Sequence, residues 1–252
     1  MTPYYEGDGV TLYHGNCIEL LPELGVSADV CVTDPPYGET SLSWDRWPKG
    51  WPALVAAALP PVTSLWCFGS MRMFLEQRDE FEEWRLAQDV IWEKQNGTGF
   101  AADRFKRVHE MVIQFYRGGW ADLQQTPPRE RGGHGKSSAR RKAEQTPDHT
   151  GKIGQQNYVD DGLRLIRSVQ RVDNMRHRSL HPTEKPTGIL DPLIAYSCPP
   201  GGTVLDPFAG SGSTLDAARC SGRKAIGIEA SEAYCEVAAQ RLSQGSLFGT
   251  VT

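Results

Sequence analysis

Residues 34–38 read Asp-Pro-Pro-Tyr-Gly and follow directly on an apolar run at residues 28–33. The run has the length and composition of a short buried strand. Two consecutive prolines cannot continue a strand ladder, so the chain is predicted to leave the sheet there in a stiff, extended turn. The turn therefore places a carboxylate, backbone carbonyls and an aromatic ring at the carboxyl end of a strand, where open α/β sheets bind ligands.

The groups in this turn suit one kind of acceptor. An aromatic exocyclic amine is a poor nucleophile because its lone pair is delocalised into the ring. Asp34 and the carbonyl of Pro35 can both accept hydrogen bonds from such an NH2 group and draw the lone pair out of conjugation. Tyr37 can stack on the face of the ring. The alternative is a surface turn capped by Asp34, which the motif alone does not exclude.

A second turn lies near the other end of the chain. Residues 206–214 read Asp-Pro-Phe-Ala-Gly-Ser-Gly-Ser-Thr, follow a predicted strand and open a predicted helix. Gly210 and Gly212 allow the backbone to approach a ligand closely, and the helix N-terminus offers free N–H groups. The next predicted strand ends in Glu229, an acid position that reaches ribose hydroxyls in dinucleotide enzymes. The spacing fits neither G-x-G-x-x-G nor a P-loop, so a different nucleotide-like cofactor is predicted, with a structural turn as the alternative.

The charge is unevenly distributed along the chain. Residues 103–185 contain 17 Lys and Arg against 10 Asp and Glu, whereas the remainder contains 10 against 21, so +7 and −11 give the net charge of −4. A basic block in an acidic chain predicts a polyanion-binding module on a catalytic body. A solvated charged loop is the alternative. Residues 117 to 159 also lose periodic apolar positions, which is typical of functional or disordered segments.

At 252 residues, the chain is long enough for one large or two small domains. It has no apolar run of transmembrane length and no leader-like segment at Met1. Six cysteines are scattered without a C-x-x-C pattern, which predicts reduced thiols in a cytoplasmic protein, with no disulfide frame and no metal site.

Hydrophobic periodicity predicts the other elements. Strands are expected at residues 10–14, 62–68, 89–93 and 110–116, and residues 163–169 regain some β character. Helices are expected at residues 17–21, 51–59, 71–86, 189–196 and 231–242.

The two turns together resemble those of the S-adenosyl-L-methionine-dependent DNA amino-methyltransferases. The Asp-Pro-Pro-Tyr motif precedes the Phe-Ala-Gly-Ser-Gly motif, and this order, with a basic segment between them, is similar to the β group. Residues 181–186, His-Pro-Thr-Glu-Lys-Pro, match the segment before the cofactor strand, and His109-Glu110 also resembles a family feature. The resemblance spans about residues 10–242. It implies an α/β, Rossmann-like methyltransferase fold with a mostly parallel mixed sheet, helices on both faces and an inserted target-recognition region.

The resemblance also assigns roles to residues. The catalytic set is Asp34, Pro35, Pro36 and Tyr37. Phe208 is expected near the cofactor adenine and Glu229 on its ribose, while Thr183 and Lys185 line the methionine end, with Lys185 near the carboxylate. The family usually has Asp where this chain has Asn16, which can still accept a hydrogen bond from the adenine amine. The full cofactor-binding set is Asn16, Cys17, Asp34, Thr183, Lys185, Asp206, Phe208, Ala209, Gly210, Ser211, Gly212, Glu229 and Ala230.

The same resemblance divides the chain. Residues 1–116 and 181–252 are expected to form the catalytic and cofactor-binding domain, and residues 117–180 a partly flexible, inserted region that recognises the DNA target. Trp44 lies in a polar loop, where it either covers a ligand or packs the loop down. The predicted DNA-binding residues are Trp44, Arg129, Arg131, Lys136, Arg140, Arg141 and Lys142.

The expected reaction is methyl transfer from S-adenosyl-L-methionine to the N6 amine of an adenine flipped out of double-stranded DNA. In the resembling family, Asp before Pro-Pro-Tyr accompanies adenine more often than cytosine, so a cytosine-N4 enzyme is the alternative. A catalytically inactive DNA-binding protein of this fold is another, and methylation of protein glutamine or RNA usually goes with Asn in place of Asp34. The resemblance favours a homodimer acting on the nucleoid of a prokaryotic or phage-type host.

Overall fold

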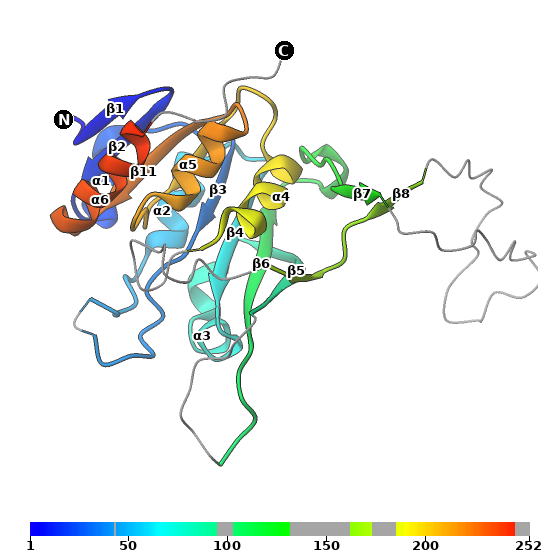
Figure 1. The fold of residues 1–252 in the computed structure, drawn as a ribbon. Coiled ribbons are helices and arrows are strands. Elements are labelled where there is room, and N and C mark those ends of the chain that lie inside the picture. The colour runs from blue at the N-terminus through cyan, green and yellow to red at the C-terminus, as the bar shows by residue number, and fades with distance from the viewer. Residues whose placement is uncertain (43, 95–102, 132–161, 173–184, 245–252) are drawn as a thin grey trace, which may run out of the picture. The chain divides into compact units, whose positions relative to one another are not determined.

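The computed structural model of the chain describes residues 1–42, 44–94, 103–131, 162–172 and 185–244 (Figure 1). In chain order its elements are β1 (Tyr5–Gly7), β2 (Val10–His14), α1 (Cys17–Leu24), β3 (Val30–Thr33), α2 (Trp51–Ala58), β4 (Thr63–Gly69), α3 (Met71–Glu76), the 3-10 helix η1 (Arg78–Phe81), β5 (Arg85–Glu93), β6 (His109–Arg117), the 3-10 helix η2 (Trp120–Asp122), β7 (Arg129–Arg131), β8 (Leu163–Leu165), β9 (Val169–Arg171), α4 (Thr187–Ser197), β10 (Thr203–Asp206), α5 (Ser213–Cys220), β11 (Lys224–Glu229) and α6 (Glu232–Ser243).

Within the described residues, one sheet has nine strands in the order β1-β2-β11-β10-β3-β4-β6-β5-β9. The five strands from β2 to β4 in this order run parallel. β1 pairs antiparallel with β2, β6 pairs antiparallel with both β4 and β5, and β9 is parallel to β5. The sheet is therefore mixed and mostly parallel, as predicted.

Two hydrophobic clusters cover the two faces of this sheet, because side chains alternate along the buried strands. In β4, Trp66 and Phe68 join one cluster, whereas Leu65 and Cys67 join the other. α4, α5 and α6 contribute to the first cluster, and α1, α2 and α3 contribute to the second (Figure 1). The prediction of helices on both faces is confirmed.

The pairing of β3 with β10 positions the site. The two strands are parallel, with Val30 opposite Val204 and Cys31 opposite Leu205. Because parallel strands end at the same edge of a sheet, the Asp-Pro-Pro-Tyr turn and the glycine turn leave the sheet side by side.

The helix expected over residues 71–86 is interrupted, so this prediction is wrong. The segment instead forms α3, η1 and the start of β5. Its aromatic residues Phe74, Phe81 and Trp84 suggest one helical face, but they reach the same hydrophobic cluster from three short successive stretches. Phe81 stacks on Phe115 with ring centroids 4.5 Å apart. Tertiary packing of aromatic rings therefore overrides the local periodicity.

The chain divides into two compact units, one formed by Met1–Thr126 with Ser168–Thr252 and a smaller one formed by Pro127–Arg167. In the described part of the smaller unit, β7 and β8 pair antiparallel. Arg129 and Arg131 lie in β7 and are exposed. The boundaries expected for the inserted region stay a prediction.

In the part of the chain that the structure describes, no helix is long and apolar enough to cross a membrane. The six cysteines are free thiols, five of them buried and Cys220 exposed.

A buried hydrogen bond between the sheet and α4 gives a test of the fold. The indole Nε1 of Trp66 donates to Ser197 Oγ at 2.8 Å, and both residues are buried. Ser197→Ala leaves the indole N–H unsatisfied and should lower the free energy of unfolding by about 1–3 kcal/mol. Denaturant titration measures this. The exposed Ser243→Ala should stay within about 0.5 kcal/mol of wild type, and an equally small effect of Ser197→Ala would contradict the packing.

Candidate active site

A cavity of about 600 Å³ opens where the parallel strands end. Its lining includes most of the predicted site residues: Asn16, Cys17, Asp34, Pro35, Pro36, Tyr37, Trp44, Lys185, Asp206, Phe208, Ala209, Gly210, Ser211, Glu229 and Ala230. Residues that were not predicted also line it, among them Thr40, Leu42, Asp45, Glu110, Ser213, Thr214, Ser231 and Tyr234. The cavity thus joins two motifs that are far apart in the sequence.

Asp34 follows β3, and both its carboxylate oxygens have donors. The Tyr37 hydroxyl donates to Oδ1 at 2.6 Å, and Lys185 Nζ donates to Oδ2. Burial raises the pKa of Asp34 above its ordinary value, and the negative charge of Glu110 raises it further. The positive charge of Lys185 and the hydrogen bonds from Lys185 and Tyr37 lower the pKa, but they do not cancel the rise. The carboxylate is therefore a stronger base than an exposed aspartate.

Lys185 links Asp34 to a second carboxylate. Its Nζ lies 3.3 Å from Oε2 of Glu110, which is the second residue of β6. Oε1 of Glu110 pairs with Lys94, directly after β5. Burial alone lowers the pKa of Lys185, but Asp34 and Glu110 raise it above its ordinary value. The ammonium group therefore stays charged at neutral pH.

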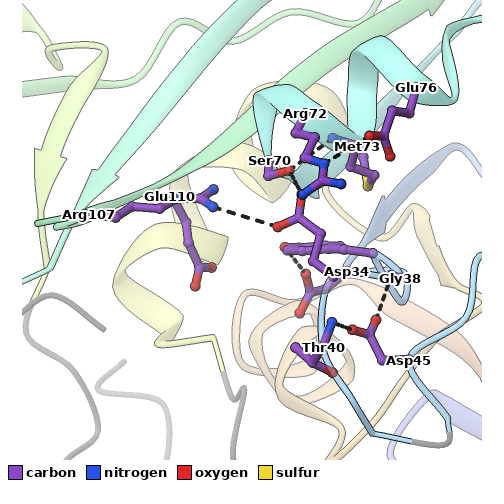
Figure 2. Close-up of polar contacts among 12 residues, drawn as sticks. Asp34, Gly38, Thr40, Asp45, Ser70, Arg72, Met73, Glu76, Arg107 and Glu110 are labelled. Carbon is purple, nitrogen blue, oxygen red and sulfur yellow. Dashed lines mark hydrogen bonds and ion pairs between the residues drawn. The ribbon is translucent and has the colours of Figure 1, made fainter. Parts of the chain in front are cut away.

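The loop after the motif is fixed by Asp45 (Figure 2). Its carboxylate accepts hydrogen bonds from the backbone N–H of Gly38 at 2.8 Å and of Thr40 at 2.7 Å. Burial opposes ionisation, but these hydrogen bonds lower the pKa of Asp45 below its ordinary value. Asp45 therefore closes the loop that carries Thr40, Leu42 and the cavity-lining Trp44.

The same loop is tied to two neighbouring segments. Glu39 accepts a hydrogen bond from the hydroxyl of Ser70, the N-cap of α3, and its Oε2 lies 3.8 Å from Nη1 of Arg107. Figure 2 shows Ser70 and Arg107 converging on this point. Arg107 belongs to the connection before β6, in which Phe105 is fully exposed between basic residues.

In the glycine turn, Asp206 supports the backbone. Its Oδ1 accepts hydrogen bonds from Thr33 Oγ1 at 2.7 Å and from the N–H of Phe208 at 3.1 Å. Burial raises the pKa of Asp206 to about 6, against the effect of hydrogen bonds from Thr33, Thr214 and Phe208. Asp206 therefore ties the end of β3 to the glycine turn.

Glu229, the last residue of β11, holds the glycine turn in place through hydrogen bonds. Its Oε2 accepts from the N–H of Gly210 and its Oε1 from the N–H of Ser231, each at 2.8 Å. Gly210 adopts φ 52°, and a Cβ at this position would point into open space, which fits a backbone that a ligand approaches. Gly212 has φ 79°, and a Cβ at this position would lie 3.0 Å from Ala238. The absence of a side chain at Gly212 therefore lets the turn pack closely against α6.

Two predicted residues sit at the start of α1. Asn16 is its N-cap, and its side-chain oxygen accepts from the N–H of Ile18 at 3.1 Å. Burial raises the pKa of Cys17 to about 12, so its thiol stays protonated. Both residues line the cavity without offering a charge.

The family model described as DNA methylase, for N6 and N4 methyltransferases, matches residues 28–240. The chain belongs to this family. Membership confirms the β-group resemblance and the cofactor, S-adenosyl-L-methionine.

Curated relatives of this methylase include two type II methyltransferases. M2.LlaDCHI of Lactococcus lactis subsp. cremoris is 26% identical over 283 residues, covering 98% of this chain and 94% of its own length. M.HinfI of Haemophilus influenzae is 28% identical over 266 residues, covering 93% of this chain and 68% of its own.

Solved structures confirm the predicted fold class. M1.HpyAVI in complex with SAM has a TM-score of 0.65 at 22% identity, over 92% of this chain and 100% of that one. The cytosine-N4-specific PvuII DNA methyltransferase has a TM-score of 0.63 at 16% identity, over 98% and 90%. At these identities the likeness extends to the fold alone.

The methylase's own residues fit the cofactor. The cavity combines an aromatic ring at Phe208, a carboxylate at Glu229, an ammonium group at Lys185 and an open backbone at Gly210. These groups match the base, ribose, carboxylate and close backbone approach that an adenosyl amino acid requires. Within the described residues, no group of three or more His, Cys, Asp or Glu could hold a metal ion.

Some predicted residues cannot be placed in this site. Thr183 of the cofactor set, and Lys136, Arg140, Arg141 and Lys142 of the DNA-binding set, lie outside the described residues. Arg129 and Arg131 belong to the smaller unit, and Gly212 is not part of the cavity lining.

Sequence reasoning missed the roles of Glu110 and Asp45. The dipeptide His109-Glu110 resembles a family feature, and this is the sequence signal for Glu110. It does not reveal that Glu110 pairs with Lys185. For Asp45 the signal was a single acid between Trp44 and Trp47 in an otherwise polar loop.

The raised pKa of Asp206 predicts a pH-dependent cost in stability. The folded state binds this proton more tightly than the unfolded state, so stability falls as pH rises from about 4 to about 6, by about 3 kcal/mol. Asp206→Asn keeps a hydrogen-bond acceptor but does not titrate, so it should be more stable than wild type above pH 6. Below pH 4 the difference should vanish. Denaturant titrations across this range test this, and parallel pH profiles for the two proteins would refute it.

Proposed function

We propose that this methylase transfers a methyl group from S-adenosyl-L-methionine to the exocyclic N6 amine of an adenine in double-stranded DNA. The observation that carries the proposal is that the carboxylate of Asp34 and the glycine turn at Gly210 line one cavity. A base inside a duplex cannot reach such a cavity, so the adenine must first leave the stack, at a cost of a few kcal/mol.

The cofactor is proposed to occupy the half of the cavity formed by the glycine turn. Phe208 faces its adenine, Glu229 its ribose, and Lys185 its carboxylate, while Thr183 is proposed from the motif alone. When bound, S-adenosyl-L-methionine supplies an electrophilic methyl group.

The chain itself prepares the acceptor. Asp34 and the carbonyl of Pro35 accept hydrogen bonds from the amine and draw its lone pair out of conjugation, and Tyr37 stacks on the base. As the N–C bond forms, the bond from the methyl group to sulfur would break and leave a neutral thioether. The amine loses one proton, and Asp34, whose pKa is raised, is the carboxylate in place to receive it. Positioning and fixed charge supply most of the rate.

A cytosine-N4 acceptor is the second candidate. Its exocyclic amine offers the same two donors, and the PvuII enzyme, which is cytosine-N4-specific, has a similar fold. The Asp at position 34 favours adenine, because the resembling family has Ser there more often in cytosine enzymes. Asp34 and the intact glycine turn also argue against an inactive DNA-binding protein. Methylation of protein or RNA usually goes with Asn in place of Asp34, and it leaves the basic segment unexplained.

DNA is proposed to approach the face on which the cavity opens. Trp44 lines the cavity and is 43% exposed. Phe105 is fully exposed between Arg104 and Lys106. It belongs to the connection before β6, which the ion pair of Arg107 with Glu39 joins to the loop after the Asp-Pro-Pro-Tyr motif. Aromatic and basic side chains together are typical of surfaces that contact unstacked nucleotides.

The basic segment is proposed as the target-recognition region. Its predicted DNA-binding residues are Arg129, Arg131, Lys136, Arg140, Arg141 and Lys142. The type II relatives suggest a role beside a restriction enzyme, on the nucleoid of a prokaryotic or phage-type host, and a homodimer is proposed from the family resemblance.

Nucleoside analysis of DNA from cells expressing the chain tests the proposed reaction. We expect N6-methyladenine at a defined sequence with wild type, and none with Asp34→Ala, which removes the group that holds the amine. Calorimetry should show that Asp34→Ala still binds S-adenosyl-L-methionine. N4-methylcytosine as the sole product would make the acceptor wrong, and loss of cofactor binding in Asp34→Ala would move this residue out of the acceptor role.

Glu229→Ala should affect the cofactor rather than the acceptor. It removes a charged acceptor for the ribose and also releases the N–H of Gly210, so the dissociation constant for S-adenosyl-L-methionine should rise about ten- to a hundredfold. The neighbouring Glu232→Ala, which is exposed on α6, is the matched control and should bind as wild type. An unchanged titration for Glu229→Ala would remove this residue from the site.

A further inference from the structure

Four charged side chains form a chain of ion pairs beside the cavity. Asp34 pairs with Lys185, Lys185 with Glu110, and Glu110 with Lys94. The side chain of Lys185 is 7% exposed and that of Glu110 is 18% exposed. Two carboxylates and two ammonium groups balance, so the cluster is neutral as long as every member keeps its charge.

This arrangement conflicts with the proposed role of Asp34. Its Oδ1 already accepts from the Tyr37 hydroxyl and its Oδ2 from Lys185, so an exocyclic amine would compete with the ammonium group of Lys185 for Oδ2. The amine gains the full acceptor strength of Oδ2 only when Lys185 moves off that oxygen. Lys185 can leave Asp34 and remain paired with a carboxylate, because Glu110 lies beside it.

Glu110 is placed to receive it. Its Oε2 lies 3.3 Å from Lys185 Nζ and, among the described residues, accepts no hydrogen bond of good geometry. Its Oε1 is held by Lys94. The antiparallel pairing of β5 with β6 sets Glu93 opposite His109, which fixes Lys94 and Glu110 at adjoining strand ends.

We propose that Glu110 is a positioning residue that takes over Lys185 when the acceptor amine binds Oδ2 of Asp34. The proposal rests on the proposed function, since it presumes an amine at Asp34. Lys185 shifts its hydrogen bond from Asp34 Oδ2 to Glu110 Oε2, and the amine takes the vacated oxygen. The exchange moves no charge out of the cluster, and Lys94 keeps Glu110 oriented throughout.

The same geometry predicts a pH signature. The groups that act on Asp34 are Lys185 and Tyr37, which lower its pKa, and burial and Glu110, which raise it. Two further groups couple to Asp34, namely Asp206 from β10 and Cys67 from β4. Asp34 must be ionised to accept from the amine, so the methylation rate should fall as pH drops through its pKa. Removing the negative charge of Glu110 lowers that pKa and should move the acid limb of the rate profile to lower pH.

Glu110→Gln tests the proposal in single-turnover methylation of DNA with the cofactor saturating. Glu110 then no longer offers a charged partner to Lys185, which stays on Asp34 Oδ2 and competes with the amine, so we expect the rate at neutral pH to fall about ten- to a hundredfold. We also expect the acid limb to shift to lower pH. Glu76→Gln, which removes the exposed partner of Arg72, is the matched control and should leave both unchanged.

Glu110→Asp separates charge from shape. It keeps the negative charge but retracts it by one methylene, so the rate should fall while the acid limb stays where it is in wild type. In a Lys185→Met background, Glu110→Gln should add less than about a threefold further loss, because the two residues act as one unit. Thermal unfolding confirms that each variant is folded.

The outcomes discriminate between the two claims. If wild type methylates no DNA, the proposed function fails. If wild type methylates DNA and Glu110→Gln does so at the wild-type rate, or loses rate with an unmoved acid limb, the role of Glu110 as the second partner of Lys185 is overturned. A shift of the limb in Glu110→Asp would also overturn it.

Discussion

The site depends on the parallel pairing of β3 with β10. This pairing sets two turns beside each other, although they are separated by most of the chain. The hydrogen bond from Thr33 Oγ1 to Asp206 Oδ1, 2.7 Å long, then joins the end of one strand to the glycine turn that follows the other. The turn proposed to hold the acceptor and the turn proposed to hold the cofactor therefore line one cavity. In the proposed function, either turn by itself presents only half of the groups that methyl transfer needs.

Buried charge is the second feature of this site, and its cost is met by pairing. A buried carboxylate without a partner would shift its pKa until it lost its charge. Asp206 is held by hydroxyl and N–H donors, Glu229 by two N–H groups, and Asp34 and Glu110 by lysines. The stability that such groups cost is typical of functional sites, where residues are arranged for chemistry rather than for folding.

The sequence predicted the parts of the fold that depend on local rules. The strand before Asp34, the double proline after it and the glycine turn each carry their own signal, and the edge where they meet follows from the topology of open sheets. The helix expected over residues 71–86 failed, because the spacing of its aromatic residues reflects contacts with Phe115 on another strand. Local periodicity cannot distinguish these two causes.

The partners of the site residues lay beyond sequence reasoning for a different reason. Glu110 reaches Lys185 only through the register of β6 against its neighbours, and Asp45 reaches Gly38 only through the closure of a loop. The spacing of charged residues along the sequence predicts neither the strand register nor the closure of the loop.

A crystal structure with S-adenosyl-L-methionine bound is the most direct measurement of the central claim, that one cavity holds both the cofactor and the acceptor-binding carboxylate. We predict that the cofactor adenine lies against Phe208, its ribose hydroxyls on Glu229 and its methyl group facing Asp34. A cofactor bound elsewhere, or one in this cavity with its methyl group turned away from Asp34, would contradict it.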